Sequence, residues 1–349
     1  MKILFLPNWK VHQLETDDAN IQAPDKQVAG HAYWFFQYFK QACTVDVIDF
    51  QQKNALSWLE KKANTYFWQG IKAFFTSHHY DVVISHGAQS GLMYSLLRTL
   101  VGKKQPLHII FDIGAMNGAR FNKIENAVIR FALKSNPSII CHSKSIIEHY
   151  KSTYTNLVSR ARYIPFGVDT QYFDTQTSSR TADYVLSFGH AKRDYETLIK
   201  AWSGVDTKHK LRLIGFKGDA VLPNIEIINK VSISELKNQI ANAKFVVIPL
   251  PVFNYSYGQM SFLQSMSMGK TVIVTNTPSS VDYLQDGKGS FFVKPYDLED
   301  MRAKIKLLLN NKRLLAESDK KSRQYVLENF SEQQMAEQVE RFILTKIHA

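Results

Sequence analysis

The sequence lacks the features that mark secreted, metal-binding or membrane-spanning proteins. Its 349 residues include two cysteines, Cys43 and Cys141, whose spacing fits neither a metal site nor a redox motif. No uninterrupted apolar run approaches the ~20 residues that cross a bilayer, and the opening MKILFLP is too short for a signal peptide's apolar region. We therefore expect a cytoplasmic protein in a reducing compartment.

Several catalytic motifs are missing as well. There is no H-E-x-x-H, no paired Cys-x-x-Cys and no cluster of aspartates, so no metal centre is expected. A G-x-S-x-G elbow is absent, which argues against a serine hydrolase. The first predicted strand, residues 1–6, is not followed by the G-x-G-x-x-G fingerprint of dinucleotide-binding proteins.

The chain does carry an excess of positive charge, with a formal net charge of +12. Residues 1–165 hold 19 Lys/Arg against 11 Asp/Glu, and the remainder holds 24 against 20. An anionic membrane surface, a nucleic acid or an acidic ligand would each suit this excess, and a solvated surface without a partner is the alternative. The charge is spread out and no recognition motif accompanies it, so we expect no nucleic-acid partner.

The most informative stretch is residues 246–276, in which two β-branched runs (VVIPL and TVIVT) flank a helical pattern over Gln259–Met268. Gly258 opens this helix and Gly269 is placed to end it. The pattern predicts a β-α-β unit with parallel strands. The backbone N–H groups at Gly258 and Gln259 would favour an anion, typically phosphate, although an ordinary strand–helix turn is the alternative.

Strand and helix patterns alternate through the chain and restart after the polar segment 175–183, which predicts two α/β halves with mostly parallel sheets. Two aromatic-rich helices are expected in the first half, one over residues 31–42 behind Gly30 and one over residues 56–77. The second mixes aromatic residues with lysines. It fits either a membrane surface or a core-facing helix with solvated lysines, and we favour the core-facing helix.

Four segments resemble one known family. They are YIPFGVDTQYF at 163–173, LSFGHAKRDYETLIKAW at 186–202, SYGQMSFLQSMSMGKTVIVTNTPSSVDYLQDGKGSFF at 256–292 and FSEQQMAEQVERFIL at 330–344. In this order and spacing they are similar to the motifs of the retaining GT-B glycosyltransferases, the group 1 type. The resemblance is strongest in the C-terminal half.

The resemblance implies an α/β protein of the GT-B fold, with two Rossmann-like parallel-sheet domains facing a cleft. We place an N-terminal, acceptor-binding domain at residues 1–168 and a C-terminal, nucleotide-sugar-binding domain at residues 169–330. Residues 331–349 would form a closing helix that crosses back to pack on the first domain.

The resemblance also implies the residues of the site. Donor-binding candidates are Gly30, His190, Lys192, Arg193, Ser256, Gly258, Gln259 and Gln264. Among the basic residues Arg193 is the first choice, because His190 stands where the family has an arginine. Gln264 stands at the position of the family's inner donor-loop glutamate, and Ser256, or Tyr255 if the match is anchored on Gly258, stands at that of the outer one. Two further candidates, for catalysis, end strands of the first half: Asp112 and His86. A helix cap or a loop hydrogen bond is the alternative for Asp112, and a hydrogen-bonded structural role is the alternative for His86.

We therefore predict a hexosyltransferase that moves a sugar from a nucleotide-diphosphate sugar, with a UDP-sugar as first choice, to an acceptor hydroxyl with retention. The acceptor would be a glycan or a lipid-linked precursor of polysaccharide or glycolipid, reached from a cytoplasmic position peripheral to the inner membrane face. No cofactor or metal is expected besides the donor. A non-catalytic GT-B protein that binds a nucleotide sugar or a partner protein is the alternative, because both glutamates are replaced.

Overall fold

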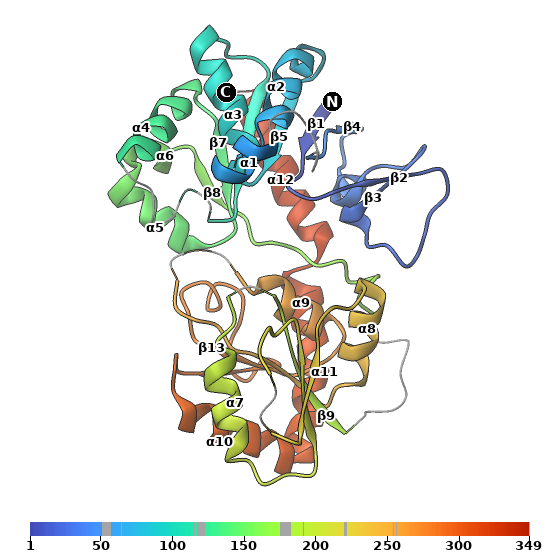
Figure 1. Ribbon diagram of the computed structural model, residues 1–349. Coiled ribbons are helices and arrows are strands. Elements are labelled where there is room, and N and C mark those ends of the chain that lie inside the picture. Colours follow the sequence, from blue (N-terminus) through green and yellow to red (C-terminus); the bar gives the residue numbers. More distant parts are fainter. Residues whose placement is uncertain are drawn as a thin grey trace. The chain divides into compact units, whose positions relative to one another are not determined.

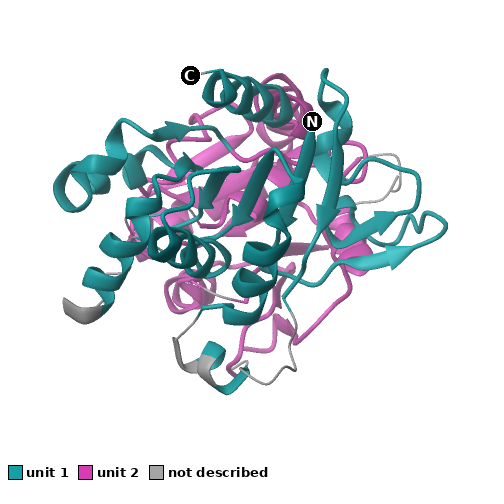
Figure 2. Cartoon of the chain, turned by 90° about the horizontal axis from the view of Figure 1, so that it is seen from above, with its two compact units in different colours: residues 1–165, 254–256, 335–349 teal, residues 166–253, 257–334 magenta. Residues whose placement is uncertain are grey.

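The chain forms two compact units, which Figure 2 colours separately. The computed structural model describes residues 1–50, 57–63, 65–114, 116, 123–174, 183–190, 192–219, 222–253, 255 and 257–348. Unit 1 comprises residues 1–165, 254–256 and 335–349, and unit 2 comprises residues 166–253 and 257–334.

In the described part of unit 1, six strands form one parallel sheet in the order β4-β1-β5-β6-β7-β8. These strands are β1 (Lys2–Leu6), β4 (Thr44–Val47), β5 (Val82–His86), β6 (Leu107–Asp112), β7 (Ser138–Cys141) and β8 (Ala161–Tyr163). The central strands are buried on both faces, as apolar runs in a parallel sheet require. The order reverses direction between β1 and β5, so their carboxyl ends are the point where such sheets bind ligands.

Helices cover this sheet (Figure 1). They are α1 (Ser57–Ala63), α2 (Phe67–Thr76), α3 (Ala88–Val101), α4 (Lys123–Ala132), α5 (Lys144–Thr153) and α6 (Thr155–Val158), with the 3₁₀ turns η1 (Ala23–Asp25), η2 (Trp34–Tyr38), η3 (Ser77–His79) and η5 (Leu133–Ser135). Tyr94 of α3 packs with Leu4 and Val83 of the sheet, whereas Tyr150 of α5 packs with Ile110 and Ile139.

The expected helix over residues 31–42 is wrong. The chain there forms only the short 3₁₀ turn η2, and Trp34 has a positive φ of 45°. The four consecutive aromatic residues from Tyr33 to Phe36 are all buried, whereas an α-helix would have turned some of them to solvent. Gly30, with a φ of 76°, therefore precedes no α-helix, and the dipole expected behind it is absent from this described segment.

Two other expectations for the first half need correction. The single helix expected over residues 56–77 is two helices, α1 and α2. The chain turns between them where the Tyr66 N–H donates to the Gln89 carbonyl at 3.0 Å. The polar composition of residues 7–26 predicts a long loop, but this segment contains β2 (His12–Leu14), which pairs in parallel with β3 (Lys26–Val28).

Unit 2 repeats the architecture, and its described strands form a six-stranded parallel sheet in the order β11-β10-β9-β12-β13-β14. They are β9 (Tyr184–Phe188), β10 (Lys210–Ile214), β11 (Ile225–Ile228), β12 (Val246–Ile248), β13 (Val272–Thr275) and β14 (Ser290–Val293). The helices are α7 (Tyr195–Ser203), α8 (Ile233–Asn242), α9 (Gln259–Ser267), α10 (Leu298–Asn310) and α11 (Lys312–Asn329). The expectation of two Rossmann-like, parallel-sheet α/β domains is confirmed.

The last helix, α12 (Glu332–Ile347), continues beyond unit 2, and residues 335–349 group with unit 1. Glu340 ties this segment to unit 1: its carboxylate accepts the backbone N–H groups of Lys40 at 3.0 Å and Gln41 at 2.7 Å. Neither α12 nor any other helix of the described residues combines the length and apolar character needed to span a bilayer.

Candidate functional site

The candidate donor site lies at the carboxyl ends of β9 and β12 in unit 2. These strands are neighbours, and the sheet order reverses direction between them. In open parallel sheets the crevice outside such a reversal is where ligands bind. The loops that leave the two strands contain most of the donor-binding residues predicted from the sequence.

Gly258 begins α9 in the left-handed region, with a φ of 78°. A Cβ at this position would lie 2.8 Å from the side chain of Leu250, so glycine is required for space as well as for conformation. The helix's first backbone N–H groups have no acceptors within it and carry the positive end of its dipole. The Oε1 atom of Gln259 is buried and has no hydrogen-bond partner in the described part of the chain.

Arg193 reaches α9 from the loop after β9. Its Nε donates to the Phe188 carbonyl at 3.0 Å, its Nη1 to the Lys192 carbonyl at 3.1 Å and its Nη2 to Ser261 Oγ at 2.7 Å. The guanidinium packs against Gly189, where a Cβ would lie 2.5 Å from Nη2. Burial lowers the pKa of Arg193, but an arginine stays charged at neutral pH. A fixed cation therefore lies beside the first turn of α9.

The same loop presents two more basic side chains. Lys192 adopts a φ of 54° and is exposed, and its Nζ lies 5.0 Å from the ring centroid of Phe253 in the loop after β12. His190 is exposed and packs against Gly215, which follows β10. A Cβ added at Gly215 would lie 2.6 Å from the Nδ1 atom of His190. The structure thus brings His190, Lys192 and Arg193 to one end of the sheet, together with Gly258 and Gln259.

Of the two residues that replace the family's glutamates, only Gln264 lies among the described residues. Gln264 is buried on α9, one turn beyond Ser261, and its contact with a nucleotide stays a prediction. Ser256 lies outside the described residues. Gly30 belongs to unit 1, where it is exposed in a turn.

His86 ends β5 at the direction reversal of the unit 1 sheet. Its ring meets the Trp9 ring edge-on, with centroids 4.7 Å apart, and packs against Phe5 and Phe111. Burial, and next the neighbouring His142, lower the pKa of His86 to about 3, so the imidazole is neutral at physiological pH. A neutral imidazole here offers hydrogen bonding rather than charge.

Asp112 ends β6 and is fully buried. Its Oδ1 accepts the Gly114 N–H at 2.8 Å, and its Oδ2 accepts the hydroxyl of Tyr150. The loop hydrogen bond considered as the alternative is therefore present, and a role as base stays a prediction. Burial, with the Asp112 charge as the next cause, holds the pKa of Tyr150 well above its usual range, so Tyr150 remains a donor.

Sequence reasoning missed His142 and Trp9. His142 directly follows β7 and is buried, and its Nδ1 donates to the Ile164 carbonyl at 2.7 Å. Burial lowers the pKa of His142 to about 4, and its ring centroid lies 6.5 Å from that of His86. The position of His142 after a buried strand was the available signal. Among the described residues no group of three or more His, Cys, Asp or Glu side chains could hold a metal ion.

Comparison with known proteins agrees with this geometry. Residues 182–311 match the model of the family Glycosyl transferases group 1, a span that includes both loops of the candidate donor site. An uncharacterized glycosyltransferase of Methanocaldococcus jannaschii is 24% identical over 257 residues, which cover 70% of this chain and 69% of that protein.

Solved structures share the fold over the whole chain. HepE of Anabaena in complex with UDP is 14% identical, with a TM-score of 0.69 over 99% of this chain and 100% of that chain. Sucrose-phosphate synthase of Thermosynechococcus elongatus is 14% identical, with a TM-score of 0.74 over 100% of both chains. The chain therefore has the GT-B fold, and its residues 182–311 are similar to the glycosyl transferases of group 1.

Proposed function

We propose that this protein is a hexosyltransferase that moves a sugar from a UDP-sugar to an acceptor hydroxyl with retention of anomeric configuration. The observation that carries the proposal is the convergence of Arg193, Lys192 and the first turn of α9 at the β9–β12 reversal. A guanidinium, an ammonium and helix N–H groups together suit a diphosphate.

The chemistry of transfer explains why such an arrangement would be useful. The bond between the anomeric carbon and the diphosphate oxygen breaks, a bond from the acceptor oxygen to that carbon forms, and the hydroxyl proton leaves to a base. Negative charge develops on the departing diphosphate as its bond lengthens. Fixed positive groups directed at it stabilise this transition state without reorganisation. Arg193 is fixed by three hydrogen bonds to protein oxygens and would supply the most rigid of these charges.

The choice of uridine relies on a relative that shares only the fold. HepE has been solved with UDP and with UDP-glucose. In this chain, Gln264 would bind the ribose through its amide, which can donate and accept hydrogen bonds but carries no charge. The acceptor would be a glycan or a lipid-linked precursor in polysaccharide or glycolipid synthesis. The exposed Trp58 and Phe75 of unit 1 would suit contact with a membrane surface.

A non-catalytic GT-B protein is the second candidate, and two observations favour it. Both carboxylate oxygens of Asp112 are occupied by protein donors. Gln264 and Ser256 supply no carboxylate at the positions where the family has glutamates. Such a protein would bind a nucleotide sugar, or a partner protein, without transferring the sugar.

Nucleotide binding followed by donor turnover tests both candidates. Thermal unfolding would be recorded with UDP, GDP, ADP and CMP, because a ligand at 100 times its dissociation constant adds about 2.7 kcal/mol. We expect UDP to stabilise the protein, Arg193→Ala to abolish the shift and UDP-glucose to be consumed when acceptor is present. Stabilisation without turnover of any hexose donor would favour the non-catalytic protein. If no nucleotide raises the unfolding temperature, both nucleotide-binding candidates are contradicted.

A further inference from the structure

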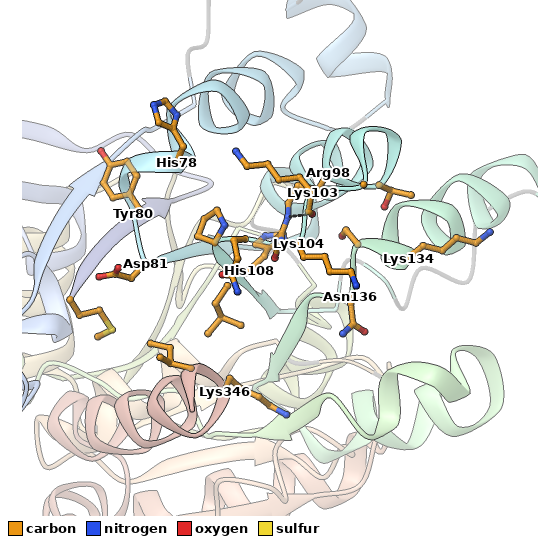
Figure 3. Close-up of a pocket in the computed structure, with 18 of the residues that line it drawn as sticks. His78, Tyr80, Asp81, Arg98, Lys103, Lys104, His108, Lys134, Asn136 and Lys346 are labelled. Atoms are coloured by element: carbon orange, nitrogen blue, oxygen red, sulfur yellow. Dashed lines mark hydrogen bonds between the residues drawn. The ribbon is translucent and has the colours of Figure 1, made fainter. Parts of the chain in front are cut away.

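A cavity lies in unit 1 at the amino ends of the strands, which is the opposite end of that sheet from His86 and Asp112. Its volume is about 1140 Å³. Figure 3 shows side chains from α3, the loop before β6, η5 and α12 around this space. The β5 and β6 ends contribute Asp81 and Leu107. All of its lining residues belong to unit 1.

The cavity's most unusual residue is Arg98, which is only 2% exposed. Its Nε donates to the Lys103 carbonyl at 3.3 Å and its Nη2 to the Lys104 carbonyl. Its Nη1 is buried without a hydrogen-bond partner, and no carboxylate of the described chain forms an ion pair with Arg98. A buried charge without a counterion is strongly unfavourable, so a bound anion would stabilise this guanidinium.

The groups packed around Arg98 do not supply that anion. Tyr94 lies beneath the guanidinium, with its ring centroid 5.5 Å from the arginine Cζ. His108 is buried, and its ring nitrogens lie 2.9 Å from Ser85 Oγ and 3.2 Å from Ser95 Oγ. Burial, with Arg98 as the next cause, holds the pKa of His108 well below its usual range, so this ring is neutral.

Four lysines line the same cavity: Lys103, Lys104, Lys134 and Lys346. Three of them lie near aromatic rings rather than near acids. The Nζ of Lys103 is 5.4 Å from the ring centroid of Phe74, that of Lys134 is 5.4 Å from Phe131, and that of Lys346 is 5.7 Å from Phe342. Asp81 is the one carboxylate among the described lining residues, and its Oδ2 already accepts the Lys2 N–H at 2.7 Å. The cavity is therefore strongly cationic.

We propose that this cavity binds a phosphate-bearing anion, with Arg98 at its base and Lys104 and Lys134 at its rim. A phosphate group accepts several charge-assisted hydrogen bonds at once, which suits one guanidinium and the lysines that line the same cavity. The phosphate can belong to a free polyphosphate or to a lipid headgroup. The lipid source would use the exposed apolar side chains beside the cavity, Leu100 and Val101. This site is separate from the candidate donor site and does not depend on the proposed sugar transfer.

Two probes distinguish the sources. Inorganic pyrophosphate binding would be measured by calorimetry without any nucleotide present. Sedimentation would be measured with vesicles of phosphatidylglycerol and phosphatidylcholine. The test variant is Lys104→Gln/Lys134→Gln, because both lysines are exposed and their loss leaves the buried Arg98 in place. The matched control is Lys306→Gln/Lys320→Gln, which removes the same charge from exposed positions outside the cavity.

We expect binding of one probe to weaken about tenfold or more in the test variant and to stay within about twofold of wild type in the control. Loss of pyrophosphate binding identifies a free phosphate, and selective loss of vesicle binding identifies a lipid headgroup. The proposal is overturned if the wild-type chain binds neither probe, or if the control variant loses binding as much as the test variant. Both lysine variants leave the residues of the candidate donor site unchanged, which keeps this result independent of the nucleotide experiment.

Discussion

Arg193 Nη2 lies 2.7 Å from Ser261 Oγ, and this hydrogen bond joins the loop after β9 to the first turn of α9. The relationship matters because neither element alone makes a site for a diphosphate. The hydrogen bond orients the guanidinium relative to the helix N–H groups, and pre-positioned charge is what stabilises an anion most effectively. The pairing also explains why Gly189 is needed, since a Cβ there would lie 2.5 Å from Arg193 Nη2 and displace the guanidinium.

Ser261→Ala removes the acceptor of this hydrogen bond while keeping the charge of Arg193. We expect UDP affinity to fall about threefold to tenfold, since a hydrogen bond to a charged group contributes about 1.5–3 kcal/mol and part of it is recovered by solvent. Calorimetry of UDP binding measures the change. Ser265→Ala is the control: its Oγ donates to the Ser261 carbonyl within α9 and does not contact Arg193 through any observed hydrogen bond. Equal losses in both variants would contradict the orienting role.

Gly258→Ala tests the opening of α9. A side chain there incurs left-handed strain and meets Leu250 at 2.8 Å, so we expect destabilisation of about 2–4 kcal/mol and weaker UDP binding. Gly287 provides a matched comparison, because it has the same φ of 78° but a Cβ added there would meet nothing within 4 Å. Gly287→Ala should cost only the strain of about 1–2 kcal/mol and leave UDP affinity unchanged. Urea unfolding and calorimetry measure both quantities, and indistinguishable variants would refute the crowding argument.

Glu340→Ala should destabilise unit 1 by about 2–3 kcal/mol. The 5%-exposed carboxylate accepts two backbone N–H groups, which would be left without their partner. The control is Glu317→Ala on α11, whose carboxylate pairs with Arg313 at 3.0 Å on the surface. Exposed pairs of this kind contribute about 0–1 kcal/mol. Hydrogen exchange of the Lys40 and Gln41 amides would locate the effect, and their unchanged protection in Glu340→Ala would argue against the assignment.

The buried histidines predict that unit 1 loses stability in mild acid. The pKa is about 3 for His86 and about 4 for His142 in the folded chain, whereas an unfolded histidine titrates near 6.5. Below pH 6.5 the unfolded chain therefore binds more protons, and stability falls as the pH decreases toward 4. Each histidine contributes a slope of about 1.4 kcal/mol per pH unit.

His142→Asn gives the matching test, because asparagine keeps an N–H donor for the Ile164 carbonyl and cannot titrate. The slope of unfolding free energy between pH 6 and 5 should be shallower by about one proton in this variant. Urea midpoints at a series of pH values measure it. The argument fails if wild type and variant lose stability in parallel.

The sequence predicts the alternating architecture well where local and tertiary preferences agree. Short apolar runs at residues 184–188, 210–214, 225–228 and 290–293 predict strands, and β9, β10, β11 and β14 have these bounds. Such runs suit strands that are buried on both faces of a parallel sheet. The positions of Ser143 and Asp297 before helical patterns predict N-terminal caps, and these residues cap α5 and α10. A missed helix, α8, begins with the capping box Ser232/Glu235, a signal present in the sequence but set in a polar segment.

Prediction fails where burial overrides periodicity. The apolar sequence around residues 33–36 predicts a helix. All four of these consecutive aromatic side chains are buried, however, which an α-helix with one buried face does not allow, and the chain forms the short turn η2 instead. The candidate site shows the same limit. The sequence predicts that Arg193 and Gly258 each follow a strand, but the hydrogen bond from Arg193 to Ser261 forms only because β9 and β12 are neighbours in the sheet. Likewise, the sequence predicts that Asp112 ends a strand, but it does not predict the hydrogen bond from Tyr150, which lies 38 residues away.

The grouping of residues 335–349 with unit 1 makes that unit discontinuous in the sequence. On the ribosome, residues 1–165 emerge first but must wait for the whole of unit 2 before Glu340 can reach the amides of Lys40 and Gln41. Unit 2 has nearly all of its residues in one block, so the later-synthesised half is free to finish folding before the earlier one. A nascent chain released early would therefore expose an incompletely capped unit 1, which makes that unit the natural target of chaperones and proteases during synthesis.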